Sequence, residues 1–211
     1  MFKPTEEFWR VFKATPGALS CCEALGIMYV CQQVPEDGLK IELGTHKGKS
    51  AIAALQTMKG EMFVLVDPIF SDQQIVDDLG KTLASACHDY TVAYVADFST
   101  NVIPMHEQYS YVFVDSGSHG DGLPMQEVKM LEDRIRPEGI IAFHDYLNQF
   151  VEVQKAYEYL LSTGKYEPIN IPWNEIIPYV KENDLEEGNN SWHVYEDNPY
   201  PNFVGAVKRK L

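Results

Sequence analysis

The chain has no run of about eighteen apolar residues, which is the length that a membrane-spanning helix needs. Its N-terminal stretch mixes acids, bases and aromatic residues, and it lacks the apolar centre of a signal peptide. Basic residues are also scarce, because 17 Lys and Arg stand against 31 Asp and Glu and leave a formal net charge of -14. A surface this acidic repels phosphate backbones. We therefore predict a cytoplasmic protein whose partners include neither a membrane nor a nucleic acid.

Cysteine is rare as well, and the 4 cysteines form no CxxC pair and no cluster with histidine. Cys21, Cys22 and Cys31 fall in a segment with helical periodicity, where cysteine behaves as a small apolar residue. This pattern disfavours a zinc site, and it disfavours a disulfide framework even more in a chain of this size. We predict reduced thiols that serve the packing of the protein.

Apolar runs alternate with helix-like segments along most of the 211 residues, a length that fits one domain. The predicted strands span 39–43, 62–67, 91–96, 111–115 and 139–145, and two final strands are expected at 165–171 and 203–209. The predicted helices span 5–14, 16–34, 50–58, 72–86, 125–135 and 150–161, with Thr15 as the cap of the second helix and Pro16 in its first turn. Strands this apolar need cover on both faces, so the alternation predicts a doubly wound parallel α/β sheet.

The segment KIELGTHKGKS at 40–50 joins a predicted strand to a glycine turn and the start of a helix. This order is typical of a nucleotide-type site at the end of a parallel strand. It is not a phosphate-binding P-loop, because Gly44 and Gly48 lie one residue too close together and Leu43 stands where the first glycine should be. It also lacks the first Gly-x-Gly of nicotinamide sites. A turn with backbone donors, preceded by the acid Glu42, suits a zwitterionic amino acid tail instead.

Acidic residues lie at or near the ends of five consecutive predicted strands, and these residues are Glu42, Asp67, Asp97, Asp115 and Asp145, the last preceded by His144. The carboxyl ends of parallel strands meet along one edge of a sheet, where open α/β sheets bind their ligands. Asp67 follows Gly48 at about the twenty-residue spacing at which an acid accepts hydrogen bonds from both ribose hydroxyls. The acids therefore predict a polar crevice, although the ribose contact alone does not distinguish a nicotinamide cofactor from S-adenosylmethionine.

Four segments together resemble the class I S-adenosylmethionine-dependent methyltransferases, namely IELGTHKGKS at 41–50, VDP at 66–68, YVFVDSGSHGDG at 111–122 and RPEGIIAFHDY at 136–146. The last two are similar to the IDGDH and GGxIxxHD segments of a small O-methyltransferase-like group. The resemblance covers about residues 36–147 in order and spacing. It implies a Rossmann-like, mostly parallel seven-stranded sheet with helices on both faces and an antiparallel last strand. It also implies S-adenosyl-L-methionine as the cofactor.

Carried over residue by residue, the resemblance implies contacts to each part of that cofactor. The methionine part would be held by Glu42, Gly44, Thr45 and Gly48, with Ser50 beside them, the ribose by Asp67, and the adenine would lie beside Asp97 and Phe98. Three of these residues have a simpler interpretation. Thr45 and Ser50 are also suited to capping the following helix, and Phe98 to packing in the core.

The resemblance leaves two alternatives for activating an acceptor hydroxyl. In metal-dependent relatives of the catechol O-methyltransferase kind, an acid after strand four and an Asp-Asn pair after strand five bind a divalent cation. Asp115 and Asp145 match the two acids, and Tyr146 replaces the Asn, so Mg²⁺ or another divalent cation is one alternative. The other is a general base, for which His144 and His119 are the candidates because imidazole titrates near neutral pH.

These features predict a methyltransferase that acts on a hydroxyl of a small molecule, such as a sugar or a natural product. Two other functions stay open. One is a non-catalytic module of the same fold that binds S-adenosylmethionine or a partner protein. The other is a nicotinamide-linked reductase, which Leu43 in the glycine turn disfavours.

The single domain is expected to have three parts: an N-terminal helical cover at 1–36, a cofactor-binding core at 37–162, and an insertion at 172–202. A connection as long as this insertion is more often functional than idle, so it is either a lid or a surface excursion. Its aromatic and imidazole side chains, Trp173, Trp192, His193, Tyr195 and Tyr200, suit stacking on a sugar or aromatic ring, or a small core of their own. The N-terminal cover either lies over the site or contacts a second copy of the chain in a homo-oligomer.

Overall fold

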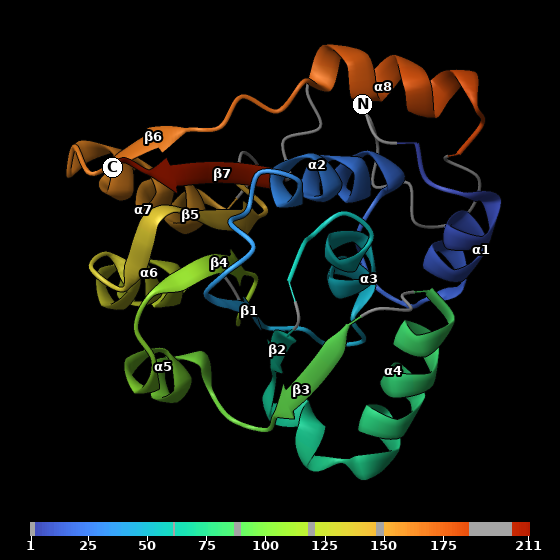
Figure 1. Ribbon diagram of the computed structural model, residues 1–211, viewed down its shortest axis with the longest axis horizontal. Coiled ribbons are helices and arrows are strands. Elements are labelled where there is room, and N and C mark those ends of the chain that lie inside the picture. Colours follow the sequence, from blue (N-terminus) through green and yellow to red (C-terminus); the bar gives the residue numbers. More distant parts are fainter. Residues whose placement is uncertain (1–2, 61, 87–89, 118–120, 147–149, 186–203) are drawn as a thin grey trace.

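The computed structural model describes residues 3–60, 62–86, 90–117, 121–146, 150–185 and 204–211. A single seven-stranded sheet crosses the molecule in the order β3-β2-β1-β4-β5-β7-β6 (Figure 1). Its strands are β1 Leu39–Leu43, β2 Met62–Val66, β3 Thr91–Val95, β4 Tyr109–Val114, β5 Ile135–His144, β6 Tyr166–Pro168 and β7 Val204–Arg209. β7 is antiparallel to both of its neighbours, whereas the pairings among β1 to β5 are all parallel. The predicted fold class is confirmed.

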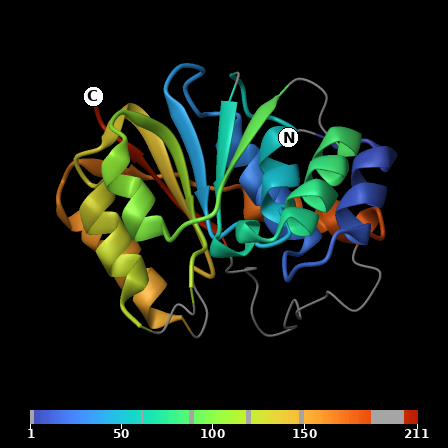
Figure 2. The same cartoon turned by 90° about the horizontal axis from the view of Figure 1, so that it is seen from below.

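Helices cover the sheet on both faces (Figure 2). They are α1 Glu6–Ala14, α2 Cys21–Cys31, α3 Lys49–Leu55, α4 Gln73–Ala86, α5 Ser99–Val102, α6 Leu123–Leu131, α7 Val151–Ser162 and α8 Trp173–Glu182, with the short 3-10 helices η1 Pro68–Ser71 and η2 Ile103–Met105. One core lies between the sheet and α1, α2, α3, α4 and α8. The other lies between the sheet and α5, α6 and α7. Two buried faces explain why the strands read as nearly continuous apolar runs.

Side chains alternate between the two faces of β1, so this alternation decides which of the two helical layers each side chain contacts. Ile41 and Leu43 belong to the core under α5 to α7. Glu42 therefore points to the opposite face, toward α3, and it is fully buried there. A carboxyl group in such a place requires a polar partner or a ligand.

The predicted helix at 16–34 is wrong in its first turn. Thr15 does not cap it, because its backbone N–H and its hydroxyl both donate to Val11 O and thereby end α1. The second helix begins at Cys21, with Ser20 as its N-cap in a reciprocal capping box with Glu23. Residues 16–19 are thus left as a loop between α1 and α2.

The C-terminal half differs from the prediction in two further places. β5 begins at Ile135, inside the predicted helix 125–135, because this residue pairs with Tyr109 ahead of an irregularity in the β4–β5 register. The insertion at 172–202 begins with the helix α8, which packs on α2. The indole of Trp173 lies so close to Gly26 that a Cβ there would be 2.5 Å from the ring. Trp192, His193, Tyr195 and Tyr200 lie outside the described residues.

Cys21, Cys22 and Cys31 are buried, and among the described residues they form no disulfide, as predicted; Cys87 lies outside the described residues. Among the helices that the structure describes, none has both the length and the apolar character to cross a lipid bilayer.

Candidate functional site

The glycine turn after β1 packs directly on the end of β4. Gly44 has φ +85°, and a Cβ at this position would lie 2.3 Å from the carbonyl oxygen of Asp115. Gly48 has φ +76°, and its Cβ would lie 2.3 Å from Cδ1 of Leu79 in α4. Both glycines are required by their conformation and by the close approach of their neighbours. The turn thereby holds the backbone of β1 beside the acid that ends β4.

Replacing Gly44 with Ala is expected to lower the free energy of unfolding by about 2–5 kcal/mol, because a strained backbone and an overpacked contact add together. Urea denaturation measures this change. Gly164→Ala is the matched control, since Gly164 has φ +73° and nothing within 4 Å of its added Cβ. Equal losses in the two variants would show that the contact with Asp115 adds nothing.

Glu42 and Thr45 place two polar atoms without partners behind this turn. Ser50 Oγ donates a hydrogen bond of 2.8 Å to Glu42 Oε1. Within the described part of the chain, Glu42 Oε2 and Thr45 Oγ1 are both buried and neither makes a well-aligned hydrogen bond, although the Thr45 hydroxyl lies close enough to Glu42 to lower the pKa of its carboxyl. The proposed capping roles of Thr45 and Ser50 are wrong, because the N-cap of α3 is Gly48 and no side chain caps that helix. Buried polar atoms without partners are typical of a site that is completed by a ligand.

Burial raises the pKa of Glu42 from 4.5 to about 8, against the opposing effects of the Ser50 hydrogen bond and the nearby Thr45 hydroxyl, and the charges of Asp115 and Asp67 raise it further. The ligand-free carboxyl therefore carries a proton at neutral pH. A cation brought next to Oε2 would favour the charged form. A raised pKa that a bound cation would lower is expected of an acid whose partner is the ammonium group of a ligand.

Asp67 follows β2 and receives two backbone hydrogen bonds, from His46 N at 2.7 Å and from Ile69 N at 3.0 Å. The first of these ties Asp67 to the glycine turn, where His46 has φ +49°. Each carboxylate oxygen has a second lone pair, so the group keeps its capacity to accept from a ligand. Its position next to the turn fits the predicted contact to a ribose.

Asp97 follows β3, and its Oδ1 accepts hydrogen bonds of 2.7 Å from Phe98 N and from Asn101 Nδ2. The Phe98 side chain is 64% exposed, so the interpretation of this residue as part of the core is wrong. An exposed aromatic ring next to a strand end is available to stack on a flat ligand. The predicted contact to adenine stays a prediction.

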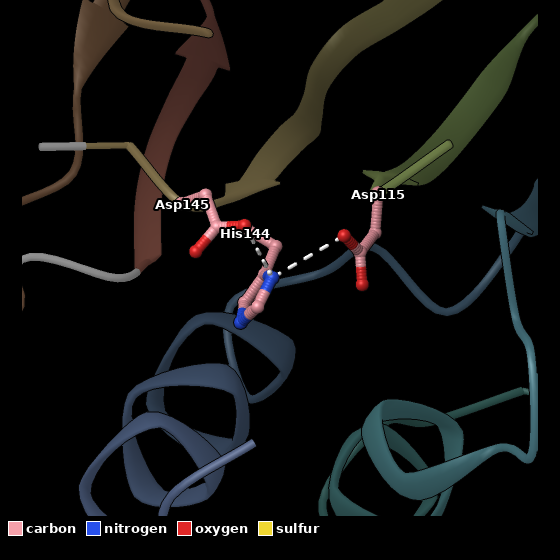
Figure 3. A group of neighbouring side chains, drawn as sticks. All are labelled: Asp115, His144 and Asp145. Carbon is pink, nitrogen blue, oxygen red and sulfur yellow. Dashed lines mark ion pairs between the residues drawn. The ribbon is translucent and has the colours of Figure 1, made fainter. Parts of the chain in front are cut away.

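His144, at the end of β5, lies close to three carboxylates, two of which, Asp115 and Asp145, are shown in Figure 3. Its Nδ1 lies 3.2 Å from Asp115 Oδ1 and 3.4 Å from Asp145 Oδ2. Its Nε2 lies 2.9 Å from Oε1 of Glu23, which belongs to α2. The backbone of Asp145 is left-handed, with φ +55°, which is a strained conformation of the kind that clusters at functional sites.

Burial by itself would lower the pKa of His144, but the neighbouring carboxylates outweigh it. The charge of Asp115 and hydrogen bonds to Asp115, Asp145 and Glu23 raise the pKa of the imidazole well above its usual value. The carboxylates therefore favour the charged form of the His144 ring, and a positive charge bound close to them would oppose this effect.

A cavity of about 360 Å³ brings most of the predicted site residues together. Its walls include Gly44, Thr45, Ser50, Asp67, Asp115, His144 and Asp145, together with Lys47, Lys49 and the loop 16–19. Glu42 lies behind this wall, in contact with Ser50. Gly48, Asp97 and Phe98 do not line the cavity. His119 lies outside the described residues, so its predicted role as a base stays a prediction.

Two features of the cavity were missed in the sequence. The loop 16–19 was assigned to a helix, yet it forms a wall of the cavity and places the N-terminal cover over the site within a single chain. Glu23 was not considered at all, although it binds the ring of His144. The capping-box spacing of Ser20 and Glu23 was a recognisable signal for the start of α2, but it carries no sign of the contact with His144.

The ligand atoms of Asp115, His144 and Asp145 all lie within 4.8 Å of one another. Two carboxylates and one imidazole fit a divalent cation, because carboxylates suit Mg²⁺ and Mn²⁺ and imidazole suits transition metals. Tyr146 does not join them. Its ring packs on Tyr157 with 4.2 Å between centroids, and it lies against Gly205 of β7. Asn148, whose amide could supply a further ligand three residues after Asp145, lies outside the described residues.

Residues 41–146 match the model of a family described as a methyltransferase domain. The match spans half of the chain, and the chain belongs to this methyltransferase family. The matched region begins in β1 and ends directly after Asp145, so it contains the glycine turn, Asp115, His144 and Asp145. No curated protein matches the chain in sequence.

Solved structures share the fold at low sequence identity. A protein from Corynebacterium glutamicum is similar with a TM-score of 0.66 and 12% identity, over 100% of this chain and 92% of that chain. The O-methyltransferase TomG from Streptomyces achromogenes, solved with S-adenosylmethionine, is similar with a TM-score of 0.60 and 13% identity, over 99% of this chain and 92% of its own. An rRNA methylase from Streptococcus thermophilus has a TM-score of 0.55 and 10% identity, over 90% of this chain and 94% of its own. These likenesses establish the Rossmann-like methyltransferase fold.

Proposed function

We propose that this chain is an S-adenosylmethionine-dependent methyltransferase that methylates a hydroxyl group of a small molecule, such as a sugar or a natural product. The observation that carries the proposal is that Glu42 Oε2 and Thr45 Oγ1 are buried beside the glycine turn without a well-aligned hydrogen bond, and that Thr45 lines the same cavity as His144. Membership of a methyltransferase family supports the reaction class.

The residues behind the turn fit the methionine end of the cofactor. Glu42 Oε2 is placed to accept from its ammonium group, and the hydroxyl of Thr45 gains a polar partner at the same time. Asp67 would bind the ribose, and Asp97 with Phe98 would lie beside the adenine. When bound, the cofactor supplies a methyl group on a sulfonium, which is already activated for transfer. The protein therefore needs to align the acceptor, exclude water and remove one proton.

His144 is the residue best placed to handle that proton. Its Nδ1 faces the cavity wall formed by Asp115 and Asp145, and the side chain is itself largely buried. A positive charge close to the two carboxylates lowers the imidazole pKa toward neutrality. The cofactor's sulfonium meets this need.

A divalent cation is the alternative to a general base, and its ligands would be Asp115, Asp145 and His144, and His144 would then not act as the base. When bound, it would supply positive charge for a developing alkoxide or phenoxide on the acceptor. Titrating ligand-free protein with Mn²⁺ and following the signal of the free ion by electron paramagnetic resonance tests this point, with Asp145→Asn as the variant expected to bind least. Equal binding by the variant and the wild type would contradict the assignment.

The acceptor is proposed to be small because the surface carries a formal net charge of -14, which opposes the approach of nucleic acid. The cavity is lined by Lys47 and Lys49 as well as by Asp67, Asp115 and Asp145. Such a lining suits an acceptor with several polar groups. The same fold occurs in an rRNA methylase, so the charge rather than the fold supports this choice.

A thermal-shift experiment tests the proposed cofactor. S-adenosylmethionine and S-adenosylhomocysteine are expected to raise the Tm of the protein, by mass action on the folded state, whereas NAD and ATP are expected to leave it unchanged. At one hundred times Kd the stabilisation is about 2.7 kcal/mol, which raises the Tm by roughly 5–10 °C for a chain of this length. An increase in Tm with NAD alone would favour the nicotinamide-linked reductase. An unchanged Tm with all of the ligands would contradict the proposal.

A second step separates an enzyme from a binding module. Protein that binds the cofactor is incubated with methyl-labelled S-adenosylmethionine and a panel of sugars, phenols and natural-product hydroxyls, and label transfer is counted. Transfer to at least one hydroxyl is the expected result. An oligoribonucleotide in the same panel serves as the competing acceptor, and transfer to it alone would overturn the proposed acceptor class.

A further inference from the structure

Lys49, the first residue of α3, is a buried cation in the wall of the cavity. The residue is only 5% exposed, and it lines the cavity together with the glycine turn. Its Nζ donates a long hydrogen bond of 3.4 Å to the carbonyl oxygen of Gly17 and lies 4.7 Å from the centroid of the Phe12 ring. An ammonium group has three hydrogens to donate. Within the part of the chain that the structure describes, no carboxylate forms an ion pair with it.

The stability of the fold does not explain a lysine at this position. The first residue of a helix meets the positive end of the helix dipole, and the first turn of α3 contains no acid to offset it. Burial lowers the pKa of the Lys49 ammonium, against the opposing charges of Cys21 and Glu23. Taking a cation out of water without a closely paired carboxylate costs free energy. A negative charge on a ligand would offset this cost.

The stem of the Lys49 side chain is held in place by the N-terminal cover. A Cβ added to Gly17 would lie 3.3 Å from both Cβ and Cδ of Lys49, so the loop 16–19 packs closely on the apolar part of the side chain. The Phe12 ring of α1 contacts the ammonium end. A charge that is already held in position loses less conformational freedom when a ligand binds. The ammonium group is thus preorganised at the cavity.

A second observation shows that this wall of the cavity is incomplete without a ligand. Ser50 follows Lys49 on α3, and its hydroxyl donates to Glu42 at 2.8 Å. Glu42 Oε2 and Thr45 Oγ1 are buried there without a well-aligned hydrogen bond, and Thr45 lines the same cavity as Lys49. The residues around the start of α3 therefore offer an acceptor for a cation and a donor for an anion within one site.

The other charges of the cavity restrict the anion that Lys49 can bind. Asp67, Asp115 and Asp145 also line the cavity. A doubly charged phosphate would be repelled by these three acids, and the segment 40–50 lacks the glycine spacing of a phosphate loop. A carboxylate carries a single charge and accepts charge-assisted hydrogen bonds from an ammonium group. The lining thus favours a carboxylate over a phosphate.

We propose that Lys49 is the anion-binding residue of the cavity and that it binds a carboxylate of the bound ligand. The use of this contact rests on the proposed methyl transfer, whereas the contact itself rests on the burial and position of the ammonium group. Two molecules carry the required chemistry. One is the cofactor, whose amino acid tail has a carboxylate next to the ammonium group assigned to Glu42. The other is an acceptor with a hydroxyl and a carboxylate, which would define the substrate as a hydroxy acid.

Lys49→Met separates the carboxylate from the rest of the cofactor. Methionine keeps an apolar stem of similar length against Gly17 and removes the charge. Isothermal titration compares S-adenosylhomocysteine with its decarboxylated analogue, which retains the ammonium group. If the cofactor supplies the carboxylate, the Kd of S-adenosylhomocysteine should rise by about 10–100-fold in the variant, because a charge-assisted hydrogen bond is lost. The Kd of the decarboxylated analogue should not rise.

A second titration tests the acceptor as the source. Hydroxy acids and their methyl esters are titrated into the protein with and without S-adenosylhomocysteine. If the acceptor supplies the carboxylate, the wild type should bind at least one acid about tenfold or more tightly than its ester, and Lys49→Met should lose this difference. If neither carboxylate depends on Lys49 in these two titrations, the proposal is overturned.

Lys47→Met is the matched control, because it removes the same charge from an exposed side chain of the same cavity. Water and salt screen an exposed charge, so the Kd values should change by less than about fivefold. Equal losses in the two variants would assign the effect to the total charge of the cavity and would overturn the specific role of Lys49. Lys49→Gln is a second neutral variant, which keeps the test available if Lys49→Met does not fold.

The titrations also distinguish this proposal from the proposed function. Wild-type protein that binds S-adenosylhomocysteine, but shows no carboxylate contact that depends on Lys49, would support the function and contradict the role of Lys49. Wild-type protein that binds no S-adenosylhomocysteine, but binds a hydroxy acid through Lys49, would support the anion site and contradict the function. Protein that binds neither ligand would contradict both.

Discussion

Replacing Glu42 with Gln is expected to remove a loss of stability that the ligand-free protein suffers as the pH rises. The pKa of Glu42 is raised from 4.5 to about 8 in the folded state, chiefly by burial. The folded protein therefore binds this proton more tightly than the unfolded chain does. Its contribution to stability is complete below pH 4.5 and is lost as the pH increases toward 8. A neutral amide at position 42 has no such dependence.

The expected difference is on the order of a few kcal/mol across that range, since each unit of pKa corresponds to about 1.4 kcal/mol. Tm measured by differential scanning calorimetry should fall less between pH 5 and pH 9 for the variant than for the wild type. Glu182→Gln, which replaces an exposed acid on α8, is the matched control and should follow the wild type. Parallel curves for wild type and Glu42→Gln would show that the carboxyl is not buried as described.

The same substitution is expected to weaken binding of the cofactor and to raise its Kd by about 10–100-fold, because a charge-assisted hydrogen bond contributes about 1.5–3 kcal/mol. Isothermal titration with S-adenosylhomocysteine at pH 8.5 measures the loss. The substitution thus makes the ligand-free protein more stable at high pH and makes cofactor binding weaker. This combination is typical of a binding-site residue that destabilises the protein in the absence of its ligand. Unchanged affinity, with the stability effect present, would place the ammonium group elsewhere.

Replacing His144 with Gln is expected to lower kcat by about 10²–10⁴-fold, the usual contribution of a positioned acid or base. The amide retains the size and one hydrogen bond of the side chain but does not take up a proton. Asp115→Asn should act in the same direction, since it removes the carboxylate at 3.2 Å from Nδ1. Initial rates with methyl-labelled cofactor on an acceptor found by screening measure both.

Measuring cofactor affinity shows whether a variant loses activity because a catalytic group is missing or because the structure of the site has changed. His144→Gln should bind S-adenosylhomocysteine about as tightly as the wild type, because the proposed cofactor contacts lie on the β1 and β2 side of the cavity. His106→Gln, on the surface after η2, is the matched control and should keep full activity. Full kcat in both His144→Gln and Asp115→Asn would remove these residues from the mechanism.

Much of the fold could be predicted because its signals are local. The apolar runs at β1, β2 and β3 coincide with the predicted strands to within one residue, since strands covered on both faces must be apolar throughout. The errors occur where a contact with a distant segment of the chain decides the secondary structure. Ile135 is drawn into β5 by Tyr109, and α8 forms in the expected insertion, where it packs on α2.

The candidate site was predictable where it depends on strand ends. Because parallel strands place their carboxyl ends along one edge, Asp67, Asp115, His144 and Asp145 could be expected to meet, and all four line one cavity. Phe98 shows the limit of this approach, since a position in the sequence does not tell whether an aromatic ring is buried. Its exposure depends on the neighbouring elements that leave it uncovered.

The glycine turn and its preceding acid predicted the type of site from the sequence alone, since their spacing excludes a P-loop and suits an amino acid tail. Only the tertiary structure decided how the site works. It buries Glu42 without a partner for Oε2, and it brings Glu23 from α2 to within 2.9 Å of His144 Nε2. Burial and hydrogen-bond direction set the protonation of a group, and both depend on residues that meet only when the chain has folded.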